Sequence, residues 1–300
     1  MPDPRDVLIL PAPPPDAVVS YGAHLDHVAD IRLPVSGSAP LVIVIHGGFW
    51  RAEYDRAHTG HLAAALVAEG YPVAQLEYRR TGAGAEGGWP ATFDDVVAGV
   101  AALPALVAAT AAELGRPAPA PGPPLLIGHS AGGHLALWYA AHAAAGSSGT
   151  APSSASAAAN SPEAAAFSVA GSSAAGLPAL VPAGVVVLAP VADLAEAYRL
   201  DLDEGAVAAL LGGDPAARSQ AYAAADPLPK TPLRSPTVIV HGTADVQVPI
   251  SLSRRYAAAA RAGGSEIALQ ELPNVGHFEL IDPRSSVWRK VTEALRSLQR

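Results

Sequence analysis

The segment Leu125-Leu-Ile-Gly-His-Ser-Ala-Gly-Gly-His134 decides how this chain folds. It opens with an apolar run typical of a buried strand, passes through the glycine-flanked serine turn 128–132, and continues into a helical pattern. A serine between strand and helix sits on a strained turn, and glycines flank it because a Cβ at either position would clash with neighbouring backbone. We therefore expect the hydroxyl of Ser130 to stand above a strand end, where a nucleophile is needed.

Short β-branched runs alternate with longer Ala/Leu helical patterns on both sides of this segment, which predicts crossover units around a mostly parallel sheet. The expected strands are 17–21, 27–33, 41–45, 73–78, 125–127, 185–188, 237–240 and 267–272. The expected helices are 58–69, 92–114, 132–145, 252–262 and 285–299. The predicted fold class is therefore α/β, with an eight-stranded, mostly parallel sheet flanked by helices in a single domain over residues 1–300.

Two segments interrupt this alternation. Residues 146–182 are Ala, Ser, Gly and Pro with almost no bulky side chains, so they bury too little apolar surface to offset their ordering entropy. We expect a mobile surface insertion there. Residues 192–228 instead carry Leu, Val and Tyr in a pattern that predicts short amphipathic helices, which would form a small cap over the site.

A second glycine-rich turn, His46-Gly-Gly-Phe-Trp50, directly follows the expected central strand. Two successive glycines let backbone N–H groups approach a bound carbonyl closely, and such donors stabilise a tetrahedral oxyanion. A further donor would come from the first residue of the helix after the serine, where the helix dipole assists. The predicted donors are Gly48, Phe49, Ala131 and Gly47.

The base and the acid are expected in loops that follow later strands. Of the ten histidines, His277 lies between the last expected strand and the last expected helix, in a loop that can reach the top of the sheet. Asp245 follows the strand before it, in the segment 238–245, and its carboxylate would hold the imidazole in one tautomer. Asp193 follows the preceding strand and is the rival for the acid. Either choice keeps the chain order Ser, Asp, His, which is that of α/β-hydrolases.

Composition excludes several classes of partner and site. The formal net charge is −8 with no basic run, which argues against nucleic-acid binding, and the absence of cysteine removes disulfides and zinc–thiolate sites. The histidine pairs 24/27 and 58/61 lack further ligands, so we predict neither a metal nor a cofactor. No signal peptide is expected at the N-terminus, and no apolar stretch of about eighteen residues is free of helix breakers. These observations predict a cytoplasmic protein without a membrane partner; a homodimer is compatible with the sequence.

These motifs resemble those of the esterase/lipase branch of the α/β-hydrolase superfamily, and most closely the kynurenine formamidase (arylformamidase) and carboxylesterase group. The turn 46–50 resembles that group's His-Gly-Gly-x-Trp oxyanion motif, and 128–134 resembles its nucleophile turn. In the hormone-sensitive-lipase pattern a third glycine stands where this chain has Phe49, whose side chain would favour small acyl groups. The resemblance implies a small-molecule carboxylic ester or an N-formyl amide as substrate, without choosing between them.

The predicted reaction is hydrolysis of carboxylic esters of small or aryl acyl substrates through an acyl-enzyme, with Ser130 attacking the carbonyl, His277 as base and Asp245 as acid. The aromatic side chains predicted to line the substrate pocket are Phe49, Trp50, Trp89, Tyr198 and Phe278. A serine peptidase of the same fold is one alternative, but such enzymes usually carry an extra propeller domain. A non-catalytic binding module of the same fold is another, and such modules typically lack a member of the triad.

Overall fold

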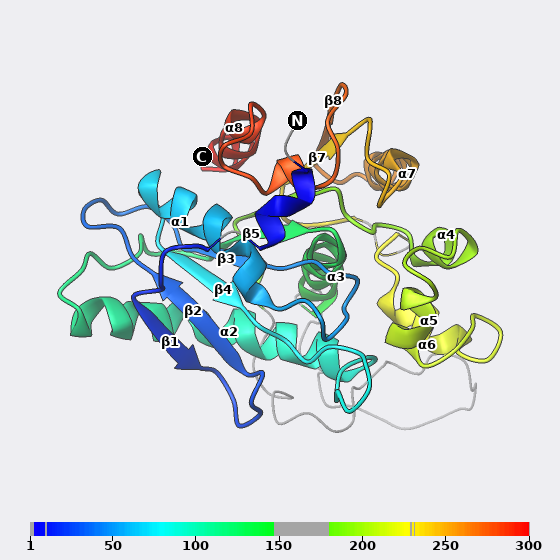
Figure 1. The fold of residues 1–300 in the computed structure, drawn as a ribbon, viewed down its shortest axis with the longest axis horizontal. Coiled ribbons are helices and arrows are strands. Elements are labelled where there is room, and N and C mark those ends of the chain that lie inside the picture. The colour runs from blue at the N-terminus through cyan, green and yellow to red at the C-terminus, as the bar shows by residue number, and fades with distance from the viewer. Residues whose placement is uncertain (1–2, 10, 147–179, 229, 231, 300) are drawn as a thin grey trace, which may run out of the picture.

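The computed structural model describes residues 3–9, 11–146, 180–228, 230 and 232–299 (Figure 1). Most of the segment predicted as a low-complexity insertion, residues 147–179, lies outside these described residues.

One eight-stranded sheet forms the centre of the molecule, in the order β1-β2-β4-β3-β5-β6-β7-β8. Strand β2 pairs antiparallel with both of its neighbours, and β3 to β8 are parallel to one another. The eight predicted strands are confirmed, with ends that shift by at most two residues. Their bounds are β1 Ala17–Ser20, β2 Val28–Arg32, β3 Val42–Ile45, β4 Val73–Leu76, β5 Leu125–His129, β6 Gly184–Leu188, β7 Thr237–Gly242 and β8 Ile267–Leu272.

Helices cover both faces of the sheet (Figure 1). The long helices are α1 Gly60–Ala68, α2 Ala91–Glu113, α3 Ala131–Gly146, α7 Ile250–Ala262 and α8 Trp288–Ser297. Three short helices lie between β6 and β7, within the segment 192–228 where short helices are predicted: α4 Leu194–Arg199, α5 Ala206–Leu211 and α6 Ser219–Ala225. Single 3-10 turns are η1 Pro4–Leu8, η2 Arg56–Thr59 and η3 Phe278–Leu280.

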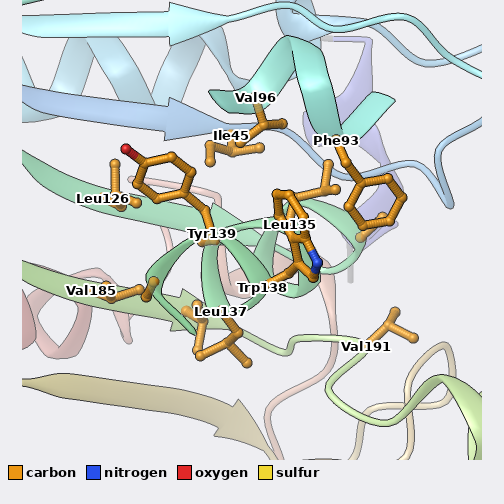
Figure 2. Close-up of a cluster of buried hydrophobic side chains, with 14 of the residues drawn as sticks. Ile45, Phe93, Val96, Leu126, Leu135, Leu137, Trp138, Tyr139, Val185 and Val191 are labelled. Atoms are coloured by element: carbon orange, nitrogen blue, oxygen red, sulfur yellow. The ribbon is translucent and has the colours of Figure 1, made fainter. Parts of the chain in front are cut away.

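The central strands are buried on both faces because their alternate side chains enter two separate cores. In β3, Ile43 and Ile45 belong to the core under α2, α3 and α7, whereas Val42 and Val44 belong to the core under α1 and α8. This is why the strand reads as a continuous apolar run and not as an alternating one. Helix α3 packs centrally: Figure 2 shows Leu135 and Tyr139 of α3 among side chains of the sheet and of α2.

Helix α2 is apolar over most of its 23 residues and continues through Pro104. By length and composition alone it could cross a membrane. In this fold its buried row, which includes Val96, Val100, Leu103 and Val107, belongs to the core against the sheet. Its apolar character therefore serves packing in this structure.

Candidate active site

Ser130 sits at the sharp turn between β5 and α3, with φ = 55°, in the left-handed region that non-glycine residues rarely adopt. Its N–H donates to the Leu188 carbonyl of β6 at 2.8 Å, which anchors the turn to the neighbouring strand. A Cβ on Gly128 would lie 2.3 Å from the Gly132 carbonyl oxygen, and a Cβ on Gly132 would lie 2.1 Å from that of Ile45. Both flanking glycines are therefore required by close backbone approach, as the sequence predicts.

The second glycine-rich turn presses against the first. A Cβ on Gly47 would lie 3.0 Å from the Cβ of Ser130, so the two turns are in contact at the carboxyl ends of β3 and β5. Gly48 has φ = 97°, and a Cβ there would lie 2.3 Å from the Cβ of Tyr54. Phe49 also has left-handed backbone, with φ = 47°. This conformation turns the loop sharply at the point where it passes the serine.

The predicted oxyanion donors surround Ser130. Gly48 and Phe49 line the same cavity as the serine. In the described part of the chain, neither of their N–H groups donates to a main-chain carbonyl. Ala131 is the first residue of α3, where the backbone N–H groups have no partner inside the helix. The three N–H groups are thus available to an oxygen bound beside the serine.

His277 and Asp245 form a close pair. The Nδ1 of His277 lies 2.6 Å from Oδ2 of Asp245, and both side chains are almost completely buried. The other carboxylate oxygen of Asp245 accepts from the N–H groups of Gln247 and Val248 at 2.8 and 2.9 Å. Because Nδ1 is engaged with Asp245, Nε2 is the ring nitrogen left for another partner.

A second histidine also contacts Asp245. The Nε2 of His241 lies 3.3 Å from Oδ2 of Asp245 and 2.9 Å from the Val248 carbonyl oxygen, and its Nδ1 lies 2.7 Å from the Ser253 hydroxyl. Burial alone would raise the pKa of Asp245, but the hydrogen bonds from His241 and His277 outweigh it and lower that pKa well below its ordinary value. The acid is therefore ionised at neutral pH. Sequence reasoning missed His241, although its position at the end of β7, four residues before the acid, was visible.

Asp193, the rival candidate for the acid, has partners other than His277. Asp193 is fully buried; its Oδ1 caps α4 by accepting from the N–H of Glu196 at 2.9 Å, and its Oδ2 lies 2.9 Å from the guanidinium of Arg255. One carboxylate oxygen thus holds the start of α4, and the other forms an ion pair with Arg255 of α7. In the described residues, the carboxylate in contact with His277 is that of Asp245.

One cavity of about 60 Å³ is lined by the predicted nucleophile and the predicted base. Ser130, His277, Gly48 and Phe49 line it, together with Phe278, which is one of the predicted pocket aromatics. The other lining residues were not singled out as site residues from the sequence: Leu8, Tyr54, His58, His129, Asp203 and Gln247. Asp203 comes from the loop between α4 and α5 and pairs with Arg51, so the predicted cap segment does reach the cavity.

Three predicted pocket aromatics lie outside the described lining of this cavity. Trp50 is fully buried, and its left-handed backbone turns its ring inward, edge-on to His134 with the ring centres 5.1 Å apart. Trp89 packs edge-on against Phe93 at 4.8 Å, and Tyr198 packs against the ring of Tyr222 at 5.9 Å. In this structure these three side chains contribute to packing.

Two further histidines, His129 and His58, line the cavity. His129 is buried beside His277 with ring centres 4.5 Å apart, and burial, then the nearby His277, lowers its pKa well below the ordinary value. His58 lies on η2, and burial, then the nearby His46, lowers its pKa to about 4. Both rings are therefore neutral at pH 7. No local sequence pattern marks either residue, because their roles depend on how the loops fold together.

His46 supports the loop 46–50, the oxyanion loop, which carries the predicted donors Gly48 and Phe49. Its Nε2 lies 2.9 Å from the carboxylate of Glu77, its Nδ1 lies 2.9 Å from the Gly47 carbonyl oxygen, and its ring stacks on Tyr78 with centres 4.3 Å apart. Burial would raise the pKa of Glu77, but the charges and hydrogen bonds of its partners, His46 foremost, lower it to about 2. His46 therefore joins the loop to the residue that follows β4.

His24 contacts the carboxylates of Glu86 at 2.9 Å and Asp26 at 3.9 Å, and His27 contacts that of Asp95 at 2.8 Å. Among the residues that the structure describes, no group of three or more His, Asp or Glu side chains is arranged to hold a metal ion.

Comparison with known proteins shows the family to which the chain belongs. The family model named BD-FAE matches residues 29–259, which is most of the chain and includes Ser130 and Asp245. The chain belongs to the BD-FAE family. A search of curated proteins by sequence found no match.

Several solved structures share the fold over nearly the whole BD-FAE chain. A truncated carbohydrate esterase from gut microbiota is 21% identical with a TM-score of 0.72, and the match covers 96% of this chain and 98% of that one. Esterase B from Lactobacillus rhamnosis, inhibited by a tributyrin phosphonate, is 18% identical with a TM-score of 0.67 (96% and 87% covered). An acetyl ester-xyloside bifunctional hydrolase from Caldicellulosiruptor lactoaceticus is 21% identical with a TM-score of 0.61 (95% and 96% covered). The chain therefore has the α/β-hydrolase fold.

Proposed function

We propose that this protein is a serine hydrolase that cleaves carboxylic esters of small acyl groups through an acyl-enzyme. The observation that carries the proposal is one cavity lined by a serine on a strained turn, a histidine, and the glycine-rich loop with its backbone N–H groups, with a buried carboxylate 2.6 Å from that histidine. Acyl transfer needs these parts together, whereas a binding module has no use for a strained serine beside a charge-paired imidazole.

In the proposed reaction His277 takes the proton of Ser130 at Nε2 while the serine oxygen forms a bond with the acyl carbon. Asp245 holds the N–H at Nδ1 and stabilises the imidazolium that forms. The N–H groups of Gly48, Phe49 and Ala131 donate to the developing oxyanion. His277 then gives its proton to the leaving alcohol oxygen as the ester C–O bond breaks, and a water molecule releases the acyl group by the reverse sequence.

The volume of the cavity favours a small acyl group. An apolar cavity of roughly 150 Å³ is needed to hold a benzene ring, whereas the catalytic cavity is about 60 Å³. Phe49 and Phe278 occupy the space where a longer chain or an aryl ring would lie. We therefore infer that acetyl esters are preferred over butyryl and benzoyl esters.

The names of the structural neighbours are consistent with this chemistry, since they include a carbohydrate esterase and an acetyl ester-xyloside hydrolase. N-formylkynurenine remains the second candidate substrate from the sequence resemblance, because its formyl group is also small. A panel of 4-nitrophenyl acetate, butyrate and benzoate with N-formylkynurenine separates these options. We expect kcat/KM to be highest for the acetate and at least tenfold lower for the benzoate, with all activity lost in Ser130→Ala. Faster benzoate hydrolysis would contradict the size argument, and activity on the formamide alone would replace the ester proposal.

A further inference from the structure

The described wall of the catalytic cavity carries little formal charge. Among the described residues that line it, none is a lysine or an arginine, and Asp203 provides the one carboxylate. The rings of His58 and His129 also line the cavity, and burial lowers the pKa of both, so these rings are neutral at pH 7. The negative charge of Asp203 therefore has no permanent positive charge opposite it on the described cavity wall.

Arg51 holds Asp203 at the cavity. Arg51 directly follows the oxyanion loop, and its guanidinium donates to the Asp203 carboxylate, to the Asp203 carbonyl oxygen and, at 3.2 Å, to the Glu204 carbonyl oxygen. Asp203 and Glu204 both have left-handed backbone, with φ = 52° and 49°. This conformation costs energy and persists where contacts hold it. The guanidinium thus fixes the turn between α4 and α5 against the oxyanion loop.

The two partners of this ion pair are placed differently with respect to a substrate. Asp203 lines the cavity, whereas Arg51 is not among the described lining residues. The side chains are 38% exposed for Asp203 and 29% exposed for Arg51, so both charges are partly shielded from water, and salt screens such charges less than fully exposed ones. A group that enters the cavity therefore meets the carboxylate, and the guanidinium is already engaged.

A second negative charge lies behind the base. Burial would raise the pKa of Asp245, but hydrogen bonds from His241 and His277 lower it, so this carboxylate is ionised as well. The chain as a whole has a formal net charge of −8, which adds repulsion of anions at longer range. An anionic group that enters the cavity also loses hydration without gaining an opposite charge. An ester that carries a carboxylate should therefore react more slowly than a neutral ester of the same shape.

We propose that Asp203 is a specificity-determining residue that makes this site discriminate against esters carrying a negative charge, and that Arg51 limits the strength of the discrimination by pairing with it. Neutral and cationic esters are the preferred substrates. This inference rests on the proposed ester hydrolysis at Ser130 and adds the charge class of its substrates.

The test uses acetyl esters of similar shape that differ in charge: 3-acetoxybenzoate, 3-acetoxybenzamide and 3-acetoxy-N,N,N-trimethylanilinium. The acetyl group is the same in all of them, so the small cavity does not distinguish them by acyl size. The measured quantities are kcat/KM for the anionic and for the cationic ester, each corrected for its rate of alkaline hydrolysis and divided by the value for the neutral amide. In wild type we expect the anionic-to-neutral ratio to lie below one and the cationic-to-neutral ratio above one.

Removing either partner of the ion pair should shift these ratios in opposite directions. Asp203→Asn keeps the shape, suits left-handed backbone and leaves the charge of Arg51 uncompensated, so the anionic-to-neutral ratio should rise about fivefold or more and the cationic-to-neutral ratio should fall. Arg51→Gln leaves the charge of Asp203 uncompensated, so the anionic-to-neutral ratio should fall about threefold. A general loss of packing would not give opposite signs.

Salt dependence provides a second readout. The Debye length falls from about 30 Å at 0.01 M salt to about 3 Å at 1 M. Both shifts should therefore become smaller over this range of sodium chloride concentration, whereas a change in the shape of the cavity would persist.

Asp201→Asn is the matched control. It makes the same substitution in the same turn, at an exposed residue with left-handed backbone (φ = 51°) that is not among the described residues of the cavity wall. Because water and salt screen an exposed charge away from the cavity, both ratios should stay within about twofold of wild type.

The outcomes distinguish this role of Asp203 from the catalytic proposal. If Arg51→Gln fails to fold, as thermal unfolding will show, Asp203→Asn and Asp203→Ala carry the test. Unchanged ratios in folded Asp203 variants, an equal shift in Asp201→Asn, or shifts of the same sign in Asp203→Asn and Arg51→Gln would overturn the charge selectivity alone, provided that hydrolysis still depends on Ser130. Ester hydrolysis that persists in Ser130→Ala would overturn the proposed function on which the selectivity rests.

Discussion

Two buried histidine–carboxylate pairs lie on either side of the oxyanion loop, and they differ in what the second ring nitrogen contacts. His277 and Asp245 are 2.6 Å apart, and His46 and Glu77 are 2.9 Å apart. Both carboxylates have lowered pKa values because hydrogen bonds and charges outweigh burial. In each pair the carboxylate fixes one nitrogen of the imidazole.

The second nitrogen decides the role. The second nitrogen of His46, Nδ1, lies 2.9 Å from the Gly47 carbonyl oxygen, and the ring is stacked on Tyr78. Both ring nitrogens of His46 are therefore engaged within the protein. His277 instead lines the cavity that contains Ser130. A histidine that is hydrogen-bonded to a carboxylate is therefore a candidate base only when its second ring nitrogen is free to face the cavity. When that nitrogen is engaged, the same kind of pair holds a loop in place.

The largest expected loss of activity comes from Asp245→Asn, which removes the negative charge of the carboxylate paired with His277. The amide has nearly the same shape as the carboxylate, but it allows His277 to take the tautomer in which Nδ1 carries no proton. In a serine protease the corresponding change lowers kcat about 10⁴-fold. We expect a loss of that order in steady-state hydrolysis of 4-nitrophenyl acetate.

The matched control is Asp193→Asn at the rival position. It should keep kcat within about threefold and lower the free energy of unfolding by about 1–3 kcal/mol, since the ion pair of a buried carboxylate with Arg255 is lost. A larger loss of kcat at Asp193 than at Asp245 would reverse the assignment of the acid.

Glu77→Gln should have an intermediate effect on activity and a clear effect on stability. The oxyanion loop loses part of its support, so we expect kcat to fall about 10- to 100-fold, less than or comparable to loss of a whole oxyanion donor.

The pH dependence of unfolding separates this role from a general loss of packing. The pKa of Glu77 is lowered from 4.5 to about 2 in the folded state, so its contribution of about 3 kcal/mol is fully present above pH 4.5 and is lost as the pH falls toward 2. Urea unfolding between pH 7 and pH 3 should therefore show a shallower acid loss in Glu77→Gln than in wild type. Parallel pH profiles for the two proteins would count against an ionised Glu77 in the pair.

A smaller loss of kcat than for Asp245→Asn is expected at His241, which contacts the same carboxylate oxygen of Asp245 as His277 does. Its hydrogen bond helps to keep the acid ionised and in place, and a hydrogen bond to a charged group contributes about 1.5 kcal/mol. His241→Asn should therefore lower kcat about tenfold with little change in KM. A loss as large as that of Asp245→Asn would mean that the two histidines share the work of the base, and the distinction drawn between the pairs would fail.

Much of this arrangement was predictable from the sequence because it depends on local patterns. The eight strands follow from short β-branched runs, and the serine turn is marked by glycines at 128 and 132 that backbone contacts require. The order of Ser130, Asp245 and His277 along the chain follows from which strands precede them.

The remaining features depend on contacts between distant segments, which no local pattern encodes. The inward turn of Trp50 results from left-handed backbone at a non-glycine residue. Leu8 reaches the cavity because the N-terminal turn packs over the carboxyl ends of strands that are remote in sequence, and Asp203 reaches it from the segment between β6 and β7. The sequence favours Asp245 over Asp193, and the structure adds the contact between the Asp245 carboxylate and His277, which depends on how two loops fold together.

Active-site labelling tests the central claim most directly. Wild-type protein is incubated with a 4-nitrophenyl alkylphosphonate, release of 4-nitrophenol is followed, and the modified residue is located by peptide mass spectrometry. The account predicts one equivalent of 4-nitrophenol, a single phosphonyl adduct on Ser130, and parallel loss of esterase activity, with no adduct in Ser130→Ala and slow labelling in Asp245→Asn. Labelling of a different residue with full loss of activity, or undiminished ester hydrolysis by Ser130→Ala, would contradict it.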